Sequence, residues 1–308
     1  MKIVAPLDNV AETGALLKGG ADEIFCGVLT ERWQKLYSDI IPPNKRGMES
    51  NLHSFAELAK VVNIAHSYGK KVALTLNAPF YSDEQVELVK EQVSEAVKTD
   101  VDAIICSDPW LIRFLQEFKG EVHISTIGVS LNSETISFYK ALGAKRIILP
   151  RHLSHDEIVE LSKKNSNKVD LEIFGLNESC ENVDGYCGFY HRVDEYNKKL
   201  FSCRIPYDIE IIGSKNMSIN RRIKTRMDHI RSCSSICGGC SIPEFKNAGL
   251  SFIKICGRGM PTSYKVKDIS FIRFVIDNTD KITKEEIKKK YLEVYGRQCS
   301  LKDCYYPR

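Results

Sequence analysis

The sequence lacks long hydrophobic runs and has no strong excess of one charge. No uninterrupted apolar stretch approaches the ~18–20 residues that a membrane-spanning helix needs. The formal net charge of +4 is too small to indicate a nucleic-acid-binding protein by itself. Internal repeats, low-complexity tracts and linkers are absent as well. With 43% hydrophobic and 27% charged residues, the composition is that of an ordinary globular protein.

The sequence also lacks the pattern of a signal peptide, since MKIVAPLDNV leads directly into an apolar strand. We therefore expect a cytoplasmic protein. Disulfides seldom persist in that compartment. The 11 cysteines are accordingly expected to be reduced thiols or metal ligands.

What the sequence does contain is an alternation of β-branched runs with amphipathic helical patterns. Strands that alternate with helices predict parallel strands joined by right-handed crossovers. Eight strands favour an α/β fold of the TIM-like (β/α)8 barrel type, although a doubly wound open sheet has a similar pattern. The expected strands are Ile3–Pro6, Glu23–Gly27, Lys71–Asn77, Ala103–Ser107, Val122–Thr126, Arg146–Arg151, Leu171–Gly175 and Phe252–Cys256. The expected helices are Asn9–Gly19, Ser54–Tyr68, Asp83–Thr99, Trp110–Phe118, Ser133–Leu142 and His155–Lys164.

Residues 178–247 break this alternation and contain six of the cysteines. We predict a cysteine-rich insertion between strands seven and eight of a single barrel domain, 1–308, with a C-terminal helix and tail at 284–308. An insertion after a strand lies on the C-terminal face, where barrel active sites are built. The insertion also holds a predicted hairpin, Pro206–Met217, and a basic run, Arg221–Arg231. That run either contacts RNA phosphates or forms a solvated helix.

Three cysteines in the insertion, Cys180, Cys187 and Cys203, have the spacing C-x6-C-x15-C, and Cys240 follows further on. Thiolates concentrated in this way indicate a metal or an iron–sulfur cluster. Zinc is the alternative metal, but structural zinc sites tend to use two close C-x2–4-C pairs. The wider separations here favour ligands gathered from several loops around a cluster.

The same region contains the triplet Cys233, Cys237 and Cys240, spaced C-x3-C-x2-C. This is the triplet of radical S-adenosylmethionine enzymes, where it follows the first barrel strand instead. The triplet either supplies a second cluster, completed by Cys299 or Cys304, or offers one ligand and two spare thiols. By contrast, Cys26, Cys106 and Cys256 each lie in an apolar predicted strand and are interpreted as small buried hydrophobes.

Polar residues at the C-terminal ends of barrel strands are expected to face the pocket. Arg151 and Arg258 are candidate carboxylate clamps, because a guanidinium pairs in bidentate fashion with a dianion. A salt bridge to a neighbouring helix is the alternative for both arginines. His152 and His191 are the acid–base candidates, whereas His123 is interpreted as a core residue. The full set of candidates near the strand ends is Asn77, Ser107, Ser125, Thr126, Arg151, Glu172 and Arg258, with Glu172 taken as catalytic.

Several long segments resemble the peptidase U32 family in order along the chain. They include IVAPLDNVAETGALLKGGADEIFCGV, NLHSFAELAKVVNIAHSYGKKVALTLN and HISTIGVSLNSETISFYKALGAKRIILPRHLSHDEI. EIFGLNESCENVDGYC matches the family's signature of E-x-F followed by two cysteines, and IPEFKNAGLSFIKICGR matches a late element. Cys233 and Cys237 are additions to the family's pattern, and Cys256 stands where its late element has glutamate.

The resemblance implies a TIM-like barrel and a 4Fe–4S cluster bound by Cys180, Cys187, Cys203 and Cys240. It implies oxygen-independent hydroxylation of a small molecule or an RNA base, with prephenate as the hydroxyl donor. The expected partners are the substrate and a second U32-type subunit, with no insertion into a membrane. Two other functions stay open: a metal-dependent peptidase of the collagenase-like type, and a non-catalytic, cluster-bearing subunit of a hetero-complex.

Overall fold

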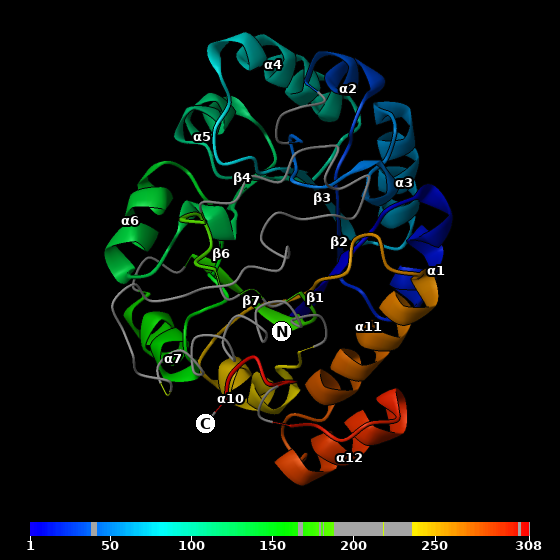
Figure 1. Cartoon of the computed structure of the whole chain (residues 1–308), viewed down its shortest axis with the longest axis vertical. Coiled ribbons are helices and arrows are strands. Elements are labelled where there is room, and N and C mark those ends of the chain that lie inside the picture. Colours follow the sequence, from blue (N-terminus) through cyan, green and yellow to red (C-terminus); the bar gives the residue numbers. More distant parts are fainter. Residues whose placement is uncertain are drawn as a thin grey trace.

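The computed structural model describes residues 1–37, 42–165, 169–178, 180, 182–187, 218, 236–300 and 303–307. Eight parallel strands form a closed barrel, in which each strand pairs with the next and β8 pairs with β1 (Figure 1). This confirms the predicted (β/α)8 fold. The strands are β1 Lys2–Pro6, β2 Glu23–Cys26, β3 Lys71–Leu76, β4 Ala103–Cys106, β5 Glu121–Ile124, β6 Arg146–Ile148, β7 Asp170–Leu176 and β8 Phe252–Ile255.

Helices surround the strands and cover their outer faces (Figure 1). Their buried residues are the apolar ones of amphipathic patterns, such as Leu58, Val61, Val62 and Ala65 of α3. The helices are α1 Thr13–Lys18, α2 Glu31–Tyr37, α3 Phe55–Ser67, α4 Asp83–Lys98, α5 Pro109–Phe114, α6 Ser133–Ala141, α7 His155–Lys164, α10 Ile242–Asn247, α11 Thr262–Asp277 and α12 Lys284–Tyr295. Short 3-10 turns include η2 Met48–Ser50, η4 Thr126–Gly128 and η6 Gly239–Ser241.

The sequence pattern located most elements within a few residues. Helix α7 begins at His155 with the predicted capping box of Ser154 and Glu157. The sixth strand is shorter than expected and ends at Ile148, two residues before Pro150. Proline lacks a backbone N–H and restricts the residue before it, so it ends regular strand pairing here.

Four charged side chains occupy the barrel interior and form what we call the lumen ion network: Glu23, Arg146, Glu172 and Lys254. Arg146 donates two hydrogen bonds to Glu23, at 2.8 and 2.7 Å, and one to Glu172 at 2.9 Å. Lys254 donates to the other Glu172 oxygen at 2.9 Å. All four side chains are buried. The network therefore joins strands β2, β6, β7 and β8 by paired charges.

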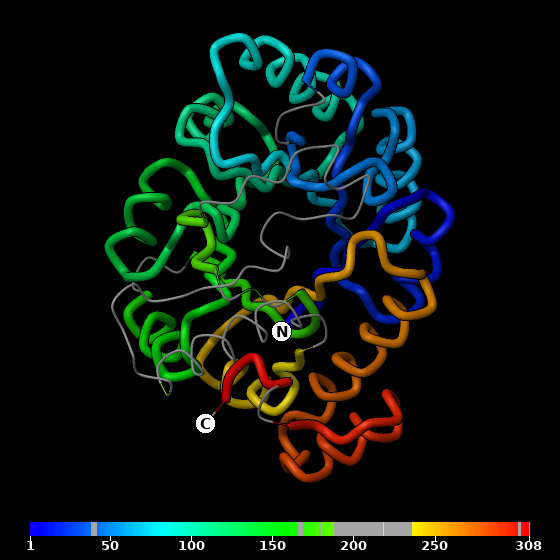
Figure 2. The backbone as a smooth tube through the Cα atoms, viewed as in Figure 1, coloured from blue at the N-terminus to red at the C-terminus, as the bar shows by residue number. Residues whose placement is uncertain are grey.

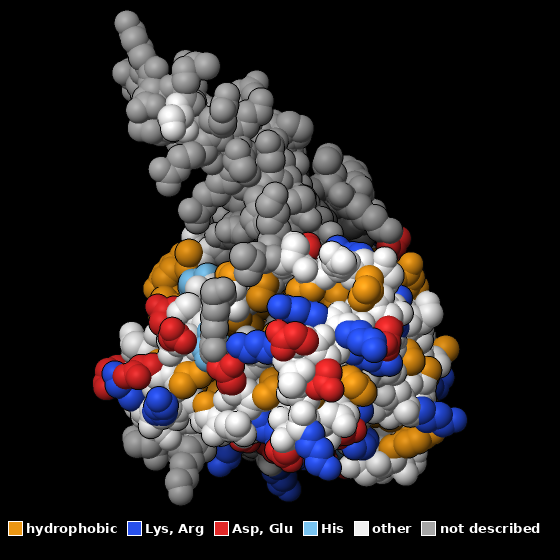
Figure 3. Space-filling model, turned by 90° about the horizontal axis from the view of Figure 1, so that it is seen from below, with side chains coloured by type: hydrophobic (Ala, Val, Ile, Leu, Met, Phe, Trp, Pro, Cys, Tyr) orange, Lys and Arg blue, Asp and Glu red, His pale blue; other side chains and the backbone are white. Residues whose placement is uncertain are grey.

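Strand β7 ends at Leu176 and β8 begins at Phe252, so the insertion lies between strands seven and eight as predicted. The predicted hairpin at 206–217 and the basic run at 221–231 lie outside the described residues. On the face shown in Figure 3, basic and acidic side chains are interspersed, in keeping with the small net charge. Every helix of the described residues is too short or too polar to span a bilayer.

Candidate functional site

A pocket opens at the C-terminal end of the barrel, above the lumen ion network. Its volume is about 110 Å³. Strand residues supply part of its wall, and residues that follow β3, β5 and β6, together with segments 44–46 and 256–258, Glu178 and Asp184, supply the rest. We call it the mouth pocket, and its polar and charged lining residues are Asn44, Lys45, Arg46, Thr75, Asn77, Ser125, Thr126, Arg151, Glu178, Asp184, Lys254 and Arg258.

Cations outnumber carboxylates in this wall by five to two. Arg46 is ion-paired with Glu178. Arg151 binds Asp184 through Nε at 3.1 Å and through Nη2, and its backbone N–H donates to the same carboxylate. Burial alone would favour the neutral acid, but the Arg151 guanidinium lowers the pKa of Asp184. These two pairs use up both carboxylates of the pocket wall.

Lys45 and Arg258 have no carboxylate partner among the described residues. Arg258 donates from Nη2 to the carbonyl of Asn44 at 2.8 Å, while its Nη1 is buried with no hydrogen-bond partner in the part of the chain that the structure describes. Burial, together with repulsion from Arg46, lowers the pKa of Arg258 to about 10 and also lowers that of Lys45. Both side chains are half-buried, and taking a cation out of water without an opposite charge beside it is costly. Both cations are thus suited to an anionic ligand.

Neutral polar groups complete the pocket. Asn77 donates from Nδ2 to Ser125 Oγ at 2.9 Å, and within the described ranges Asn77 Oδ1 is buried without a partner. Thr75 Oγ1 and Asn44 Oδ1 are likewise buried and unpaired among the described residues. Unsatisfied buried polar atoms that face one cavity are typical of a ligand site.

The structure brings together five of the residues predicted to bind substrate: Asn77, Ser125, Thr126, Arg151 and Arg258 all line the mouth pocket. The sequence did not indicate Asn44, Lys45 and Arg46, because they lie in an irregular segment before η2 without a strand pattern. Lys254 was missed because a lysine inside β8 interrupts an apolar run. Its cation, which contacts the Phe25 ring at 3.7 Å, reaches the pocket from below.

The two predicted catalytic residues that the structure describes, Glu172 and His152, lie outside the wall of the mouth pocket. Glu172 is the third residue of β7 and lies in the lumen ion network, outside the pocket wall. Burial disfavours its carboxylate, yet Lys254 and Arg146 lower the pKa of Glu172 to about 2, so it is no proton donor near neutral pH. The position of Glu172 thus corrects its assignment to a strand end. His152 is exposed after β6, and His191 lies outside the described residues.

Two half-buried thiols, Cys180 and Cys187, lie beside the mouth pocket, and we call them the mouth thiols. Cys180 lies near Arg151, and Cys187 lies near Lys45. The segment between them is fixed by Gly185, whose φ is 83°. A Cβ there would lie 2.2 Å from Val129, so only glycine lets the segment pack on η4.

The other described cysteines fall into two groups. Cys26, Cys106 and Cys256 are buried, as predicted, and burial raises the pKa of Cys26 to about 12. The second group lies near the C-terminal stretch: Cys237 is buried and forms a backbone bridge with Cys304, and Cys240, Cys299 and Cys304 are half-buried. Cys203 and Cys233 lie outside the described residues. Within the described ranges, no three His, Cys, Asp or Glu side chains form a ready metal centre.

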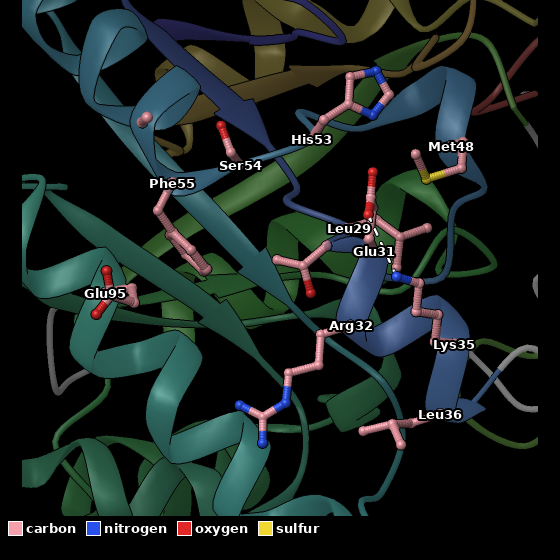
Figure 4. Close-up of a pocket in the computed structure, with 12 residues that line it drawn as sticks. Leu29, Glu31, Arg32, Lys35, Leu36, Met48, His53, Ser54, Phe55 and Glu95 are labelled. Atoms are coloured by element: carbon pink, nitrogen blue, oxygen red, sulfur yellow. Dashed lines mark ion pairs between the residues drawn. The ribbon is translucent and has the colours of Figure 1, made fainter.

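A larger hollow, of about 950 Å³, lies outside the barrel between α2 and the start of α3 (Figure 4). Charged side chains such as Arg32, Lys35 and Glu95 line it, and Glu31 pairs with Lys35 at 3.8 Å. None of the predicted site residues and none of the cysteines lines this groove. The mouth pocket is therefore the candidate functional site.

Fold and pocket together define a (β/α)8-barrel protein with a cation-rich site at the C-terminal face. The family model described as "Peptidase family U32" matches residues 8–307, and the chain belongs to this family. It is 15% identical to the solved U32 peptidase Mk0906, with a TM-score of 0.50 over 85% of this chain and 94% of that one. At that identity the likeness shows the fold alone.

Among curated relatives, tRNA hydroxylation protein P of Helicobacter pylori is 26% identical over 90% of this chain. A collagenase of Porphyromonas gingivalis is 26% identical over 85%. The 23S rRNA 5-hydroxycytidine C2501 synthase of Escherichia coli is 24% identical over 88%. The chain spans 65%, 62% and 38% of the lengths of these three proteins.

Proposed function

We propose that this chain is a U32-type enzyme that hydroxylates an RNA base without molecular oxygen. The observation that carries the proposal is the excess of cations in the mouth pocket, with Lys45 and Arg258 left for an anionic co-substrate. The names of several relatives, which describe tRNA and rRNA hydroxylation, support RNA as the substrate class. An RNA substrate also agrees with the cytoplasmic location predicted from the sequence.

The co-substrate is a small organic dianion, for which prephenate, implied by the family resemblance, is the first candidate. Arg258 Nη1 and the Lys45 ammonium would donate hydrogen bonds to its carboxylates. Asn77 Oδ1 would accept from a hydroxyl group of the same ligand. Arg46 and Arg151 are held by Glu178 and Asp184, so they would orient the ligand without changing partners. The pocket would thereby select its co-substrate by both charge and size.

The cofactor we propose is a 4Fe–4S cluster bound by Cys180, Cys187 and Cys203, to which the resemblance adds Cys240. The donor set fits in part, because Cys180 and Cys187 are half-buried thiols near Arg151 and Lys45, at the edge of the mouth pocket. When bound, the cluster would supply electron transfer or a binding position for the donor. The residues of the mouth pocket would hold the anionic co-substrate and exclude water from the site.

The test is an anaerobic reaction of the full chain with unmodified tRNA and rRNA transcripts, with and without prephenate. We expect nucleosides that have gained one oxygen atom, measured by mass spectrometry, only when prephenate is present. The variant Cys180→Ala should give no product, whereas Cys106→Ala, a buried thiol of β4, should remain active. A product that requires O2, or cleavage of a collagen peptide in place of RNA modification, would overturn the proposal.

A further inference from the structure

Three cations of the mouth pocket depend on one segment with little regular structure. Residues 42–52, all of which the structure describes, contain the short turn η2 and a bridge at Leu52. Lys45 and Arg46 of this segment line the pocket, and the carbonyl of Asn44 accepts from Arg258 Nη2 at 2.8 Å. Figure 2 shows the stretch after β8, in orange, running beside the N-terminal part of the chain, in blue. The position of these cations therefore follows from how the segment is held.

Asn51 holds the segment, although it does not line the pocket. It is buried, and its Nδ2 donates to the carbonyls of Gly47 at 2.7 Å and Arg46 at 3.0 Å. Its Oδ1 accepts from Asn44 Nδ2 at 2.7 Å, and the same Asn44 Nδ2 donates to the carbonyl of Val28 at 3.2 Å. We call Asn44 and Asn51 the asparagine pair. The pair closes the segment into a loop and fastens it to the residues that follow β2.

The residue after β2 makes room for the asparagine pair. A Cβ at Gly27 would lie 2.3 Å from both Asn44 Nδ2 and Asn51 Oδ1, too close for either atom to stay in place. The segment then returns to the same point, because the N–H of Leu52 donates to the carbonyl of Gly27 at 2.9 Å. The pair therefore fits beneath the segment only because residue 27 is glycine.

The backbone of Lys45 shows that surrounding contacts impose the shape of the segment. Lys45 has a φ of 57°, in the left-handed region that residues other than glycine seldom adopt. Such a conformation persists where neighbouring contacts hold it, and it is typical of ligand sites. The residues on either side of Lys45 supply these contacts, since the Asn44 side chain and the Arg46 carbonyl both bond to Asn51.

We propose that Asn51 is a positioning residue, which holds Lys45 and Arg258 in place before an anionic ligand binds. Groups that are fixed beforehand lose little conformational freedom on binding, so a preformed site binds its ligand more tightly. The choice of a small organic dianion as the ligand rests on the proposed function. The role of the asparagine pair in holding the segment does not.

The first test measures prephenate binding to the full chain by calorimetry. Asn51→Ala removes three hydrogen bonds from the segment, whereas Gly27→Ala keeps the bonding groups and displaces them. Each change should weaken binding by about tenfold or more. The double variant should bind no more weakly than the weaker single variant, because both changes act on the same pair.

The matched control is Asn165→Ala. The Asn165 side chain also bonds to backbone groups, those of Val169, but it does so before β7 and therefore at the opposite end of the barrel. Asn165→Ala should leave prephenate binding unchanged. Wild-type affinity in Asn51→Ala, or an equal loss of affinity in the control, overturns the proposal.

Hydrogen exchange of residues 42–52 tests the same role without a ligand. In the wild type, we expect slow exchange at amides such as that of Lys45, which donates to the Pro42 carbonyl at 3.1 Å. Exchange of the segment should be about tenfold faster in Asn51→Ala and Gly27→Ala, and unchanged in Asn165→Ala.

The wild type decides even if neither variant folds, because exchange of this segment at the rate of an unstructured peptide contradicts the proposal. The exchange result also separates this inference from the proposed function. If exchange follows the expected pattern but the wild type binds no prephenate, the proposed co-substrate is wrong and the positioning role of Asn51 stands.

Discussion

The barrel holds two sets of charged side chains, one above the other, with opposite designs. In the lumen ion network, two cations face two carboxylates, and every charge has a partner within 3 Å. In the mouth pocket, four cations of the loops and strand ends face two carboxylates. They are Lys45, Arg46, Arg151 and Arg258, facing Glu178 and Asp184.

The two sets differ in ion pairing and not in residue type. In the network each charge is paired with an opposite charge on another strand, although Arg146 Nε makes no hydrogen bond in the described part of the chain. In the pocket, Lys45 and Arg258 face no carboxylate of their own among the described residues, and Arg258 Nη1 is buried without a hydrogen-bond partner there. A folded protein bears the cost of such a group where a ligand is to bind. Substitutions in the lumen ion network should therefore change the stability of the fold, whereas substitutions in the mouth pocket should change ligand binding.

The largest expected effect concerns the mouth thiols beside the pocket. Cys180→Ala and Cys187→Ala should each lower the iron content at least tenfold, because a cluster that lacks one thiolate is poorly held. Iron and sulfide analysis after anaerobic purification measures this. The matched control is Cys26→Ala, since its thiol is buried in β2. If the iron content of Cys180→Ala equals that of the wild type, the mouth thiols are not ligands of the cluster.

The second effect belongs to the lumen ion network. Arg146→Met should lower the free energy of unfolding by about 3–5 kcal/mol, because Glu23 and Glu172 lose a buried partner. Denaturant unfolding measures it. Arg32→Met removes an exposed pair with Glu91 and should cost less than about 1 kcal/mol. Equal losses in the two variants would contradict the structural role of the network.

A third effect is the response to acid. The pKa of Glu172 is lowered from its ordinary 4.5 to about 2 in the folded chain, so its contribution to stability is complete above pH 4.5 and is lost as the pH falls through 2. At ~1.4 kcal/mol per pKa unit, this amounts to about 3 kcal/mol. Between these pH values, the unfolding free energy of the wild type should therefore fall more steeply than that of Glu172→Gln. Parallel pH profiles would show that Glu172 is not the group responsible.

The smallest expected effect concerns Arg258 and its role in binding an anion. Arg258→Leu should weaken binding of a small dianion by ten- to a hundredfold, the value of a charge-assisted hydrogen bond of about 1.5–3 kcal/mol. Calorimetry with prephenate measures this change, and the unfolding free energy should stay constant or rise. Lys35→Met removes one positive charge from the hollow between α2 and α3, outside the barrel, and should leave binding of the dianion unaltered. Unchanged affinity in Arg258→Leu would refute the anion site.

The barrel was predictable from the sequence because eight apolar runs alternate with amphipathic patterns. Helix α11, Thr262–Asp277, was not anticipated, since its buried face includes Lys265 and Asp268, which interrupt the apolar pattern. Arg151 and Arg258 could be named because each closely follows a strand. Their neighbours Lys45 and Arg46 could not, since an irregular loop carries no periodicity that indicates where it packs.

The arrangement of the cysteines was harder to predict than the fold. Sequence spacing and family resemblance join Cys240 to Cys180 and Cys187. The structure pairs the backbone of Cys237 with that of Cys304, a contact between segments more than 60 residues apart that follows only from how the C-terminal stretch packs on the end of β7. Spacing reports which thiols are neighbours along the chain, and tertiary packing decides which of them share a site.

The central claim is that the mouth of this barrel combines an iron–sulfur cluster with an anion pocket. The most direct measurement is the iron, sulfide and zinc content of the full chain purified without oxygen, together with its absorption spectrum. We predict about four iron and four sulfide per chain and a broad visible absorption that bleaches on reduction. Zinc without iron or sulfide would contradict the account.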